Sequence, residues 1–486
     1  MKRQGYHREP EGPEFRESVA EVYHRLTAYA TDRHWLEPLD DDRLRQDFMP
    51  MSADDRPPPF KEYPTGLPRV QLPDAPGTTA VAAELLNGAC DVLGRTSVNL
   101  SVLSAILAQC AGLTRRVPHS DDYFRAASSA GNCHPLELYV CARETDGLAD
   151  GVWHYDPRGH ALTKIGPPPN GDVAALVVSG VPWRSCWKYA ERGYRYLGWD
   201  CGTVAAQALL AAYAQGVNAR LETAFVDSTV GRLIGAQEND EFPLVIVPLG
   251  VGTPAVNPSG EAIGGHLGGR FQRFAVVTAA HEAGNLTAPE EVADWRQRHA
   301  GQRHIARGLT TIPEGTGSDP FDVLVHKRRS ARKFDPRAAI PLTAAQWIAD
   351  AASAVLPWDA GQLHDVRVVV HRVGDLRSGS YRPVAGEWVR IGPSDRELTY
   401  RTCVDQELGR DAAALFFITP SPGPDVAPDA RTYRAALLAA GVVVGKTYLA
   451  AAALGLGCSG LTFVDSLLPA VIGAPAALAV AGVGFG

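Results

Sequence analysis

The sequence predicts a mixed helix-and-strand (α+β) fold that is built from two tandem copies of one unit. Three observations lead to this prediction: apolar residues recur at helical spacing, short runs of β-branched and aromatic residues lie between them, and one long pattern occurs twice. A chain of 486 residues is long enough for two to four domains.

The elements follow in order along the chain. Residues 1–60 are charged and rich in proline, and they carry one expected helix around 15–28. Beyond this segment the periodicity predicts helices over 81–93 and 100–113, and strands over 136–143 and 243–250. A stretch rich in Gly, Pro and His (252–320) reads as a connection, after which the helical pattern resumes at 321.

An internal repeat indicates how the chain is divided into domains. Tyr194-Arg195 aligns with Tyr433-Arg434, and at the same spacing Gly202 aligns with Gly441. After one gap, Phe225-Val226-Asp227 aligns with Phe463-Val464-Asp465, and a weaker match sets 128–143 over 358–373. We therefore expect four parts: an N-terminal extension (1–74), a first domain (75–252), a connection (253–319) and a second, diverged domain (320–486).

The amino-acid composition excludes several classes of protein and partner. Hydrophobic residues make up 45% and charged residues 21%, which is typical of a globular core, and the net charge of −7 argues against nucleic acid or an anionic membrane as partner. The tract 435–457 is interrupted by Lys446 and Tyr448, so we expect a buried helix there. The eight cysteines form no metal-binding pattern and no signal sequence is recognisable, so we expect reduced thiols, no metal and a cytoplasmic protein.

Two short motifs could bind a ligand. The segment 324–336 places Arg328, Ser330 and Arg332 at alternate positions, and guanidinium groups suit phosphate or the polar edge of a heterocycle. By itself this run could equally be a solvated basic surface. The segment 128–135 is a loop of small residues before a strand, where backbone amides can approach a ligand closely, although it could equally be an ordinary turn.

In combination, the two motifs resemble the nitroreductase family of FMN-dependent oxidoreductases. That family combines R-x-S-x-R/K-x-F with P-S-A/S-G-N-x-Q/H-P; here these stand as Arg328–Phe334 and Ser128–Pro135. More closely, 125–162 and 187–202 resemble azoline dehydrogenases (SagB/ThcOx type) of thiazole- and oxazole-modified peptide and thiopeptide biosynthesis, and 60–73 resembles their lead-in segment.

The resemblance implies a nitroreductase-like fold in which the two copies pair as an intrachain pseudo-dimer. Family dimers bind FMN in the interface, and here the arginine motif is intact only in the second copy and the small-residue loop only in the first. One FMN site is therefore implied, whereas the second site carries Asp359 in place of Ser129. The residues implied for FMN are Arg328, Ser330, Arg332, Ser129, Ala130, Gly131, Asn132, Leu461 and Thr462. Basic residues that the family places farther along for the phosphate are not recognisable, so we expect Arg328 and Arg332, or residues that the sequence does not identify, to hold it.

The resemblance also implies the chemistry. Lys188 and Tyr189 match a Lys-Tyr pair regarded as catalytic in azoline dehydrogenases, where flavin accepts a hydride and a base takes a proton. Otherwise Lys188 would be a surface ion-pair partner of Glu191 or of another acid, and Tyr189 a core aromatic residue. The implied partners are an azoline-containing precursor peptide, a cyclodehydratase and a possible second copy of the chain. Two alternatives stay open: another flavin oxidoreductase acting on a small molecule, and a non-catalytic scaffold of a peptide-modifying complex.

Overall fold

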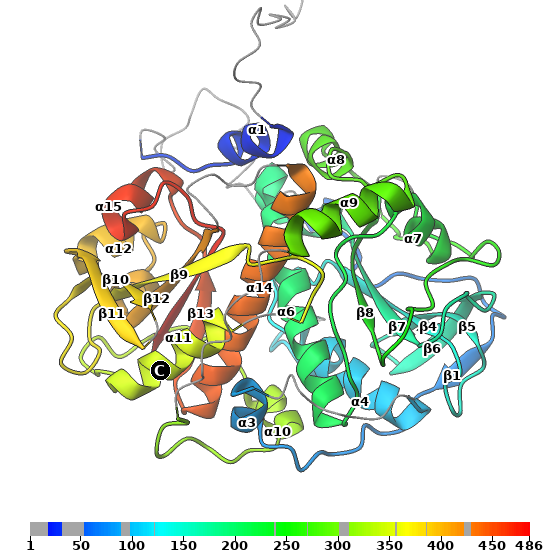
Figure 1. The fold of residues 1–486 in the computed structure, drawn as a ribbon, viewed down its shortest axis with the longest axis horizontal. Coiled ribbons are helices and arrows are strands. Elements are labelled where there is room, and N and C mark those ends of the chain that lie inside the picture. The colour runs from blue at the N-terminus through cyan, green and yellow to red at the C-terminus, as the bar shows by residue number, and fades with distance from the viewer. Residues whose placement is uncertain are drawn as a thin grey trace, which may run out of the picture.

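A computed structural model describes residues 18–31, 53–88, 98–120, 122–237, 240–269, 271–300, 311–354, 357–384, 386–421 and 429–486. Two six-stranded sheets lie on opposite sides of a central pair of long helices, α6 (Gly193–Ala214) and α14 (Ala430–Ala453) (Figure 1). The first half of the chain supplies one sheet and the second half supplies the other. The α+β class and the tandem organisation predicted from the sequence are confirmed.

The first sheet is antiparallel and has the strand order β1-β6-β5-β4-β7-β8. Its strands are β1 (Arg69–Gln71), β4 (Leu136–Ala142), β5 (Gly151–Asp156), β6 (Ala161–Gly166), β7 (Ala175–Gly180) and β8 (Phe242–Pro248). The strands predicted over 136–143 and 243–250 are β4 and β8, and both are buried at every position. A separate hairpin, β2 (Leu113–Arg116) with β3 (Tyr123–Arg125), precedes the loop of small residues.

The second sheet has the order β11-β10-β9-β12-β14-β13, in which β11-β10-β9-β12-β14 matches β6-β5-β4-β7-β8 of the first sheet, and β1 has no counterpart among the described strands. Its strands are β9 (His364–Val370), β10 (Gly379–Val384), β11 (Glu387–Gly392), β12 (Ala414–Pro420), β13 (Gly457–Leu461) and β14 (Ala479–Gly484). In the first sheet, the place of β13 is taken by bridges from Ala219 and Glu222 to the segment of β8. The two halves therefore share one topology.

Helices pack around the two sheets and the central pair. In the first half they are α3 (Ala82–Leu86), α4 (Leu100–Ala111), α5 (Pro182–Tyr189) and α7 (Asp227–Leu233); in the second half they are α10 (Phe321–Lys327), α11 (Leu342–Ser353), α12 (Arg396–Thr402), α13 (Glu407–Asp411) and α15 (Leu468–Ile472). Single 3-10 turns lie at Ala53–Asp55, Ala130–Asn132, Ala190–Arg192 and Asp465–Leu467. The helix predicted over 100–113 is α4. The one predicted over 81–93 is observed only over α3, and 89–93 lie outside the described residues.

The central helices cross at the two glycines that the repeat aligns. A Cβ atom added to Gly202 would lie 2.5 Å from Gly441 Cα, so only glycine allows this backbone approach. Helix α14 is long and apolar enough to cross a membrane, but 94% of its most apolar window is buried inside the protein, as expected of a core helix.

The extension and the connection contain helices that pack on the central pair. Helix α1 (Val19–Leu26) lies where the sequence predicts one, and its start is fixed by a capping box of Ser18 and Glu21. The connection is more ordered than its composition suggests, because it holds α8 (Ala275–Glu282) and α9 (Pro289–Ala300). Helices α1 and α8 lie side by side at one end of the central pair (Figure 1).

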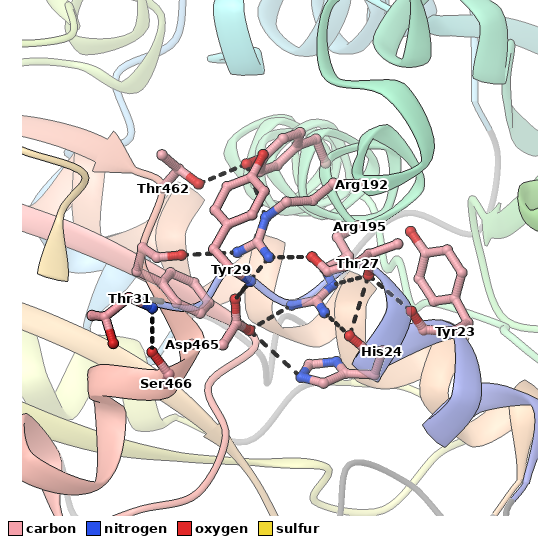
Figure 2. A network of polar contacts seen from close by, with 12 residues as sticks. Tyr23, His24, Thr27, Tyr29, Thr31, Arg192, Arg195, Thr462, Asp465 and Ser466 are labelled. Carbon is pink, nitrogen blue, oxygen red and sulfur yellow. Dashed lines mark hydrogen bonds and ion pairs between the residues drawn. The ribbon is translucent and has the colours of Figure 1, made fainter. Parts of the chain in front are cut away.

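Buried ion pairs tie the two copies together. Asp465 of the second copy accepts hydrogen bonds from Arg192 at 2.8 Å and Arg195 at 2.9 Å, both in the first copy (Figure 2). In mirror fashion, Asp227 of the first copy accepts bonds of 2.6 Å each from Arg431 and Arg434 of the second. Because these residues are aligned by the repeat, the reciprocal pairs are the structural signature of a pseudo-twofold axis.

The segments after α1 and α8 complete these two clusters in the same way. The backbone N–H of Tyr29 donates to Asp465 at 2.8 Å, and that of Leu286 donates to Asp227 at 2.9 Å. The extension and the connection thus occupy equivalent places, one in each copy.

Candidate functional site

The loop of small residues is held in place by helix α6. Asp200 of α6 accepts hydrogen bonds from the Ser129 hydroxyl and, at 2.9 Å, from the Ala130 backbone N–H. Asn132 accepts a 2.8 Å bond from His134, which is a structural role for that histidine. Helix α6 therefore fixes the loop through one side-chain hydroxyl and one backbone N–H.

Lys188 and Tyr189 lie directly on this loop. They end helix α5, and Lys188 Nζ donates to the Gly131 carbonyl oxygen at 3.2 Å. Gly131 has a φ of 58°, and a Cβ there would lie 2.8 Å from Lys188 Nζ and nearer still to the Tyr189 hydroxyl. Glycine is required by both the conformation and the contact. Lys188 forms no ion pair with Glu191 in the part of the chain that the structure describes.

The arginine motif approaches the same loop from the second copy. Arg328 Nε donates to the Ala126 carbonyl at 3.1 Å, just before the loop. Ser330 pairs with Cys458 of β13, and its hydroxyl lies 3.1 Å from the Tyr448 hydroxyl. Arg332 is exposed and makes no hydrogen bond or ion pair with any described residue.

The turn after β13 forms a third wall. The Thr462 hydroxyl lies 2.7 Å from the Tyr196 hydroxyl (Figure 2), and the ring of Tyr196 contacts that of Tyr189 with centroids 4.5 Å apart. These contacts connect the turn at Leu461–Thr462 to the Lys188-Tyr189 side of the loop. Within the described residues, no acceptor faces the backbone N–H of Thr462.

The pseudo-symmetric position in the other half is closed. Thr223 and Ala224 lie on the turn of the first copy that the repeat sets against Leu461–Thr462, and both of their backbone N–H groups donate to Asp359, at 2.8 and 2.9 Å. The neighbouring backbone is also paired, since the Leu221 N–H donates to the Pro357 carbonyl at 2.8 Å. The Asp359 carboxylate thus accepts the hydrogen bonds of this turn. On the turn of the second copy, by contrast, the Thr462 N–H has no acceptor among the described residues.

Helix α9 seals this second position. Arg296 lies 3.3 Å from Asp359 and 3.1 Å from Glu222, and it donates to the Ala224 carbonyl at 2.9 Å. At this second position, Asp359 and Arg296 of helix α9 therefore pair with each other and with the turn at Thr223 and Ala224.

Burial sets the protonation of the first site. It raises the pKa of Asp200 to about 7, against the lowering effect of its bonds to Ser129 and Ala130. Burial also raises the pKa of Tyr189, so this phenol keeps its proton and can donate a hydrogen bond. The pKa of the Cys133 thiol rises to about 12 through burial, which makes it a poor nucleophile.

A recess adjoins the loop on the side of Lys188. It is a shallow, open recess lined by Asn132 and Trp187 together with Arg56, Phe60 and Arg184. Its aromatic and cationic wall gives a ligand chain room beside the loop.

The structure brings most of the sequence-predicted residues together and leaves one aside. Lys188 and Tyr189 contact the loop, Tyr196 links Tyr189 to the Thr462 turn, and Arg328 lies against the backbone just before the loop, whereas Arg332 is exposed. Sequence reasoning missed Tyr448, Tyr196 and Asp200. Tyr448 did carry a signal, because it interrupts an otherwise apolar helix, and it accepts the Gly460 N–H at 2.7 Å.

Comparison with known proteins identifies the family. The sequence model of the nitroreductase family matches residues 93–251 and 325–478, which is more than half of the chain. The chain belongs to the nitroreductase family. Two matched segments agree with the two structural halves, and members of this family are flavin-dependent oxidoreductases that generally bind FMN.

Individual relatives agree with this assignment. A provisionally assigned nitroreductase of Methanocaldococcus jannaschii is 28% identical over 168 residues, which are 32% of this chain and 81% of the relative. A crystal structure of a provisionally assigned nitroreductase from Anabaena variabilis covers 97% of this chain and all of its own, with a TM-score of 0.72 and 22% identity. At that identity the likeness shows the fold alone, but it shows it for both halves at once.

Proposed function

We propose that this nitroreductase-family protein is an FMN-dependent azoline dehydrogenase, which oxidises thiazolines or oxazolines in a precursor peptide to the aromatic azoles. The observation that carries the proposal is the position of Lys188 and Tyr189, on the loop that faces the flavin in the family and in contact, through Tyr196, with the Thr462 turn. The resemblance of 125–162 and 187–202 to azoline dehydrogenases names the substrate.

The residues of the first site fit FMN. Three features support this fit: an N–H group at Thr462 with no acceptor among the described residues, small side chains at Ser129–Gly131, and the guanidinium group of Arg328 beside the start of that loop. The turn at Thr223 and Ala224 allows a comparison within the same chain, because there both backbone N–H groups already donate to Asp359. The same contrast argues against a scaffold that has lost its cofactor.

The flavin, when bound, supplies the acceptor for the hydride that leaves the azoline ring. Lys188 is placed to take the accompanying proton, because its amine is held at the Gly131 carbonyl and has no carboxylate partner among the described residues. Tyr189 stays protonated through burial, so it orients the ring by donating a hydrogen bond. The recess lined by Trp187 and Phe60 gives the flanking peptide a place beside these groups.

The test uses the purified chain with its bound flavin and a cyclised peptide. Azoline oxidation removes two hydrogen atoms per ring, so mass spectrometry should show a loss of about 2 Da for each ring converted. Reoxidation of chemically reduced flavin by a nitroaromatic assay substrate, with no activity on the peptide, would contradict the azoline assignment and favour a small-molecule oxidoreductase. A visible spectrum without flavin bands would favour the scaffold.

A further inference from the structure

The junction that follows Lys188 and Tyr189 contains a strained residue. Helix α5 ends at Tyr189 and α6 begins at Gly193, so a single 3-10 turn, Ala190–Arg192, joins the two helices. Ala190 is buried and has a φ of 45° and a ψ of −141°, a conformation that glycine adopts readily and that a Cβ atom disfavours. Such strain persists only where neighbouring groups hold the backbone in place.

The N-terminal extension supplies two of the contacts that hold this junction. The hydroxyl of Tyr23 on α1 is buried and donates to the Glu191 carbonyl at 2.7 Å, and the Tyr23 ring packs edge-on against that of Tyr194 with centroids 5.5 Å apart. Arg192 donates to the Thr27 carbonyl at 2.6 Å (Figure 2). Helix α1 and the residue after it therefore bind two of the three residues of the 3-10 turn.

Arg192 also joins the junction to the turn at Thr462. Its guanidinium group donates to Asp465 at 2.8 Å and to the Phe463 carbonyl at 3.2 Å. The junction thus lies between the extension and that turn. Because Lys188 and its neighbour directly precede the junction in the chain, a change of its backbone would move both of them.

The other half of the protein lacks this tyrosine. Helix α8 occupies the place of α1 there, and His24 of α1 and His281 of α8 each lie within hydrogen-bond distance of a tyrosine hydroxyl, at 3.1 and 3.2 Å. The residue before His281 is Ala280, so the place of Tyr23 is taken by a side chain without a hydroxyl. The hydroxyl therefore occurs only in the half that contains the Lys-Tyr pair.

Building on the proposed function, we propose that Tyr23 is a positioning residue for azoline oxidation. Its hydrogen bond to Glu191 keeps Ala190 in the strained conformation, which keeps Lys188 and Tyr189 against the loop of small residues. Without that bond the junction relaxes and the pair moves away from the loop. The extension, which precedes the first residue matched by the family model, thereby sets the geometry of the reaction.

The experiment compares single and double variants of the full-length protein with bound FMN, using mass spectrometry of a cyclised peptide to obtain kcat and KM. Tyr23→Phe removes only the hydroxyl and should lower kcat about ten- to a hundredfold, the loss typical of a displacement of about 1 Å, with KM and FMN affinity within about threefold of wild-type. Ala190→Gly alone should leave kcat within about threefold, because glycine adopts the same conformation without strain. In the double variant kcat should return to within about threefold of wild-type, since no strain is left to move the pair.

Tyr381→Phe is the matched control, because Tyr381 is a buried tyrosine on β10 that donates to the Arg377 carbonyl at 2.6 Å, and it should leave kcat unchanged. A normal kcat in Tyr23→Phe would overturn the positioning role. So would a loss that Ala190→Gly does not restore, or a parallel loss of FMN affinity, since either would show that the hydroxyl supports the fold in general. In each of these cases oxidation by the wild-type chain would still support the proposed function, whereas a wild-type chain that binds FMN and oxidises no azoline would overturn both.

Discussion

Two matched substitutions in the reciprocal ion pairs should both lower the free energy of unfolding, but only one of them should weaken flavin binding. Asp465→Asn removes the charge that faces Arg192 and Arg195, each only 1% exposed, and Asp227→Asn does the same to Arg431 and Arg434. Removing one partner of a buried ion pair typically costs about 3–5 kcal/mol, because the other charge stays buried and unpaired. We expect both variants to be destabilised by about this amount.

Flavin binding should distinguish the two variants. Asp465 lies three positions after Thr462, and Arg192 also donates to the Phe463 carbonyl at 3.2 Å, so loss of the carboxylate loosens the turn of the first site. One weakened backbone hydrogen bond, about 0.5–1.5 kcal/mol, corresponds to about a two- to tenfold loss of FMN affinity. Asp227 supports the closed position, so Asp227→Asn should leave FMN affinity unchanged.

The assay is denaturant or thermal unfolding of both variants, followed by FMN titration at a temperature where both are folded. Although burial raises it, the pairing with Arg192 and Arg195 holds the pKa of Asp465 well below its usual value. The stability that Asp465 contributes is therefore present above about pH 4 and is lost as pH falls below that value. Equal loss of FMN in both variants, or no destabilisation in either, would refute the reasoning.

Three further results are expected. Lys188→Ala and Tyr189→Phe should each lower the rate of azoline oxidation about 10²- to 10⁴-fold with flavin content unchanged, measured by mass spectrometry. Arg328→Ala should weaken FMN binding about ten- to a hundredfold in a fluorescence titration, because it removes a charge-assisted bond. Since buried Asp200 keeps its proton up to about pH 7 and an unfolded Asp loses it near pH 4, thermal unfolding should show the wild-type losing stability relative to Asp200→Asn as pH rises from about 4 to 7.

Each of these three predictions can be contradicted by a specific result. Normal turnover of Lys188→Ala with full flavin content would show that water or a neighbouring group, and not Lys188, takes the proton. Full FMN affinity in Arg328→Ala would place the arginine motif outside the site. A constant stability difference between Asp200→Asn and the wild-type over that pH range would show that Asp200 is ionised throughout.

The pairing of the two halves was predictable because its contacts are made by repeated residues. Gly202 and Gly441 meet at the helix crossing, and Asp227 and Asp465 hold the reciprocal ion pairs, so the alignment of the copies already contained the interface. The strands were predictable for a related reason, since buried runs such as Leu136–Ala142 are apolar or aromatic at every position but Glu137.

Other features depend on contacts that no local pattern specifies. Nothing in the composition of the connection indicates that Arg296 reaches Asp359, because the two residues meet only after the halves pair. Arg332 shows the converse, since a motif position that matches a family pattern lies exposed here.

The central claim is that the pseudo-dimer binds one flavin, in the site bounded by Arg328, the Ser129–Asn132 loop and Thr462. The most direct test releases flavin from the purified chain, saturated with FMN, by denaturation and measures it against protein concentration. The open N–H of Thr462 and the closed pair at Thr223 and Ala224 predict a ratio near one. A ratio near two would show that Asp359 and Arg296 do not block the second position, and a ratio near zero would remove the flavin site altogether.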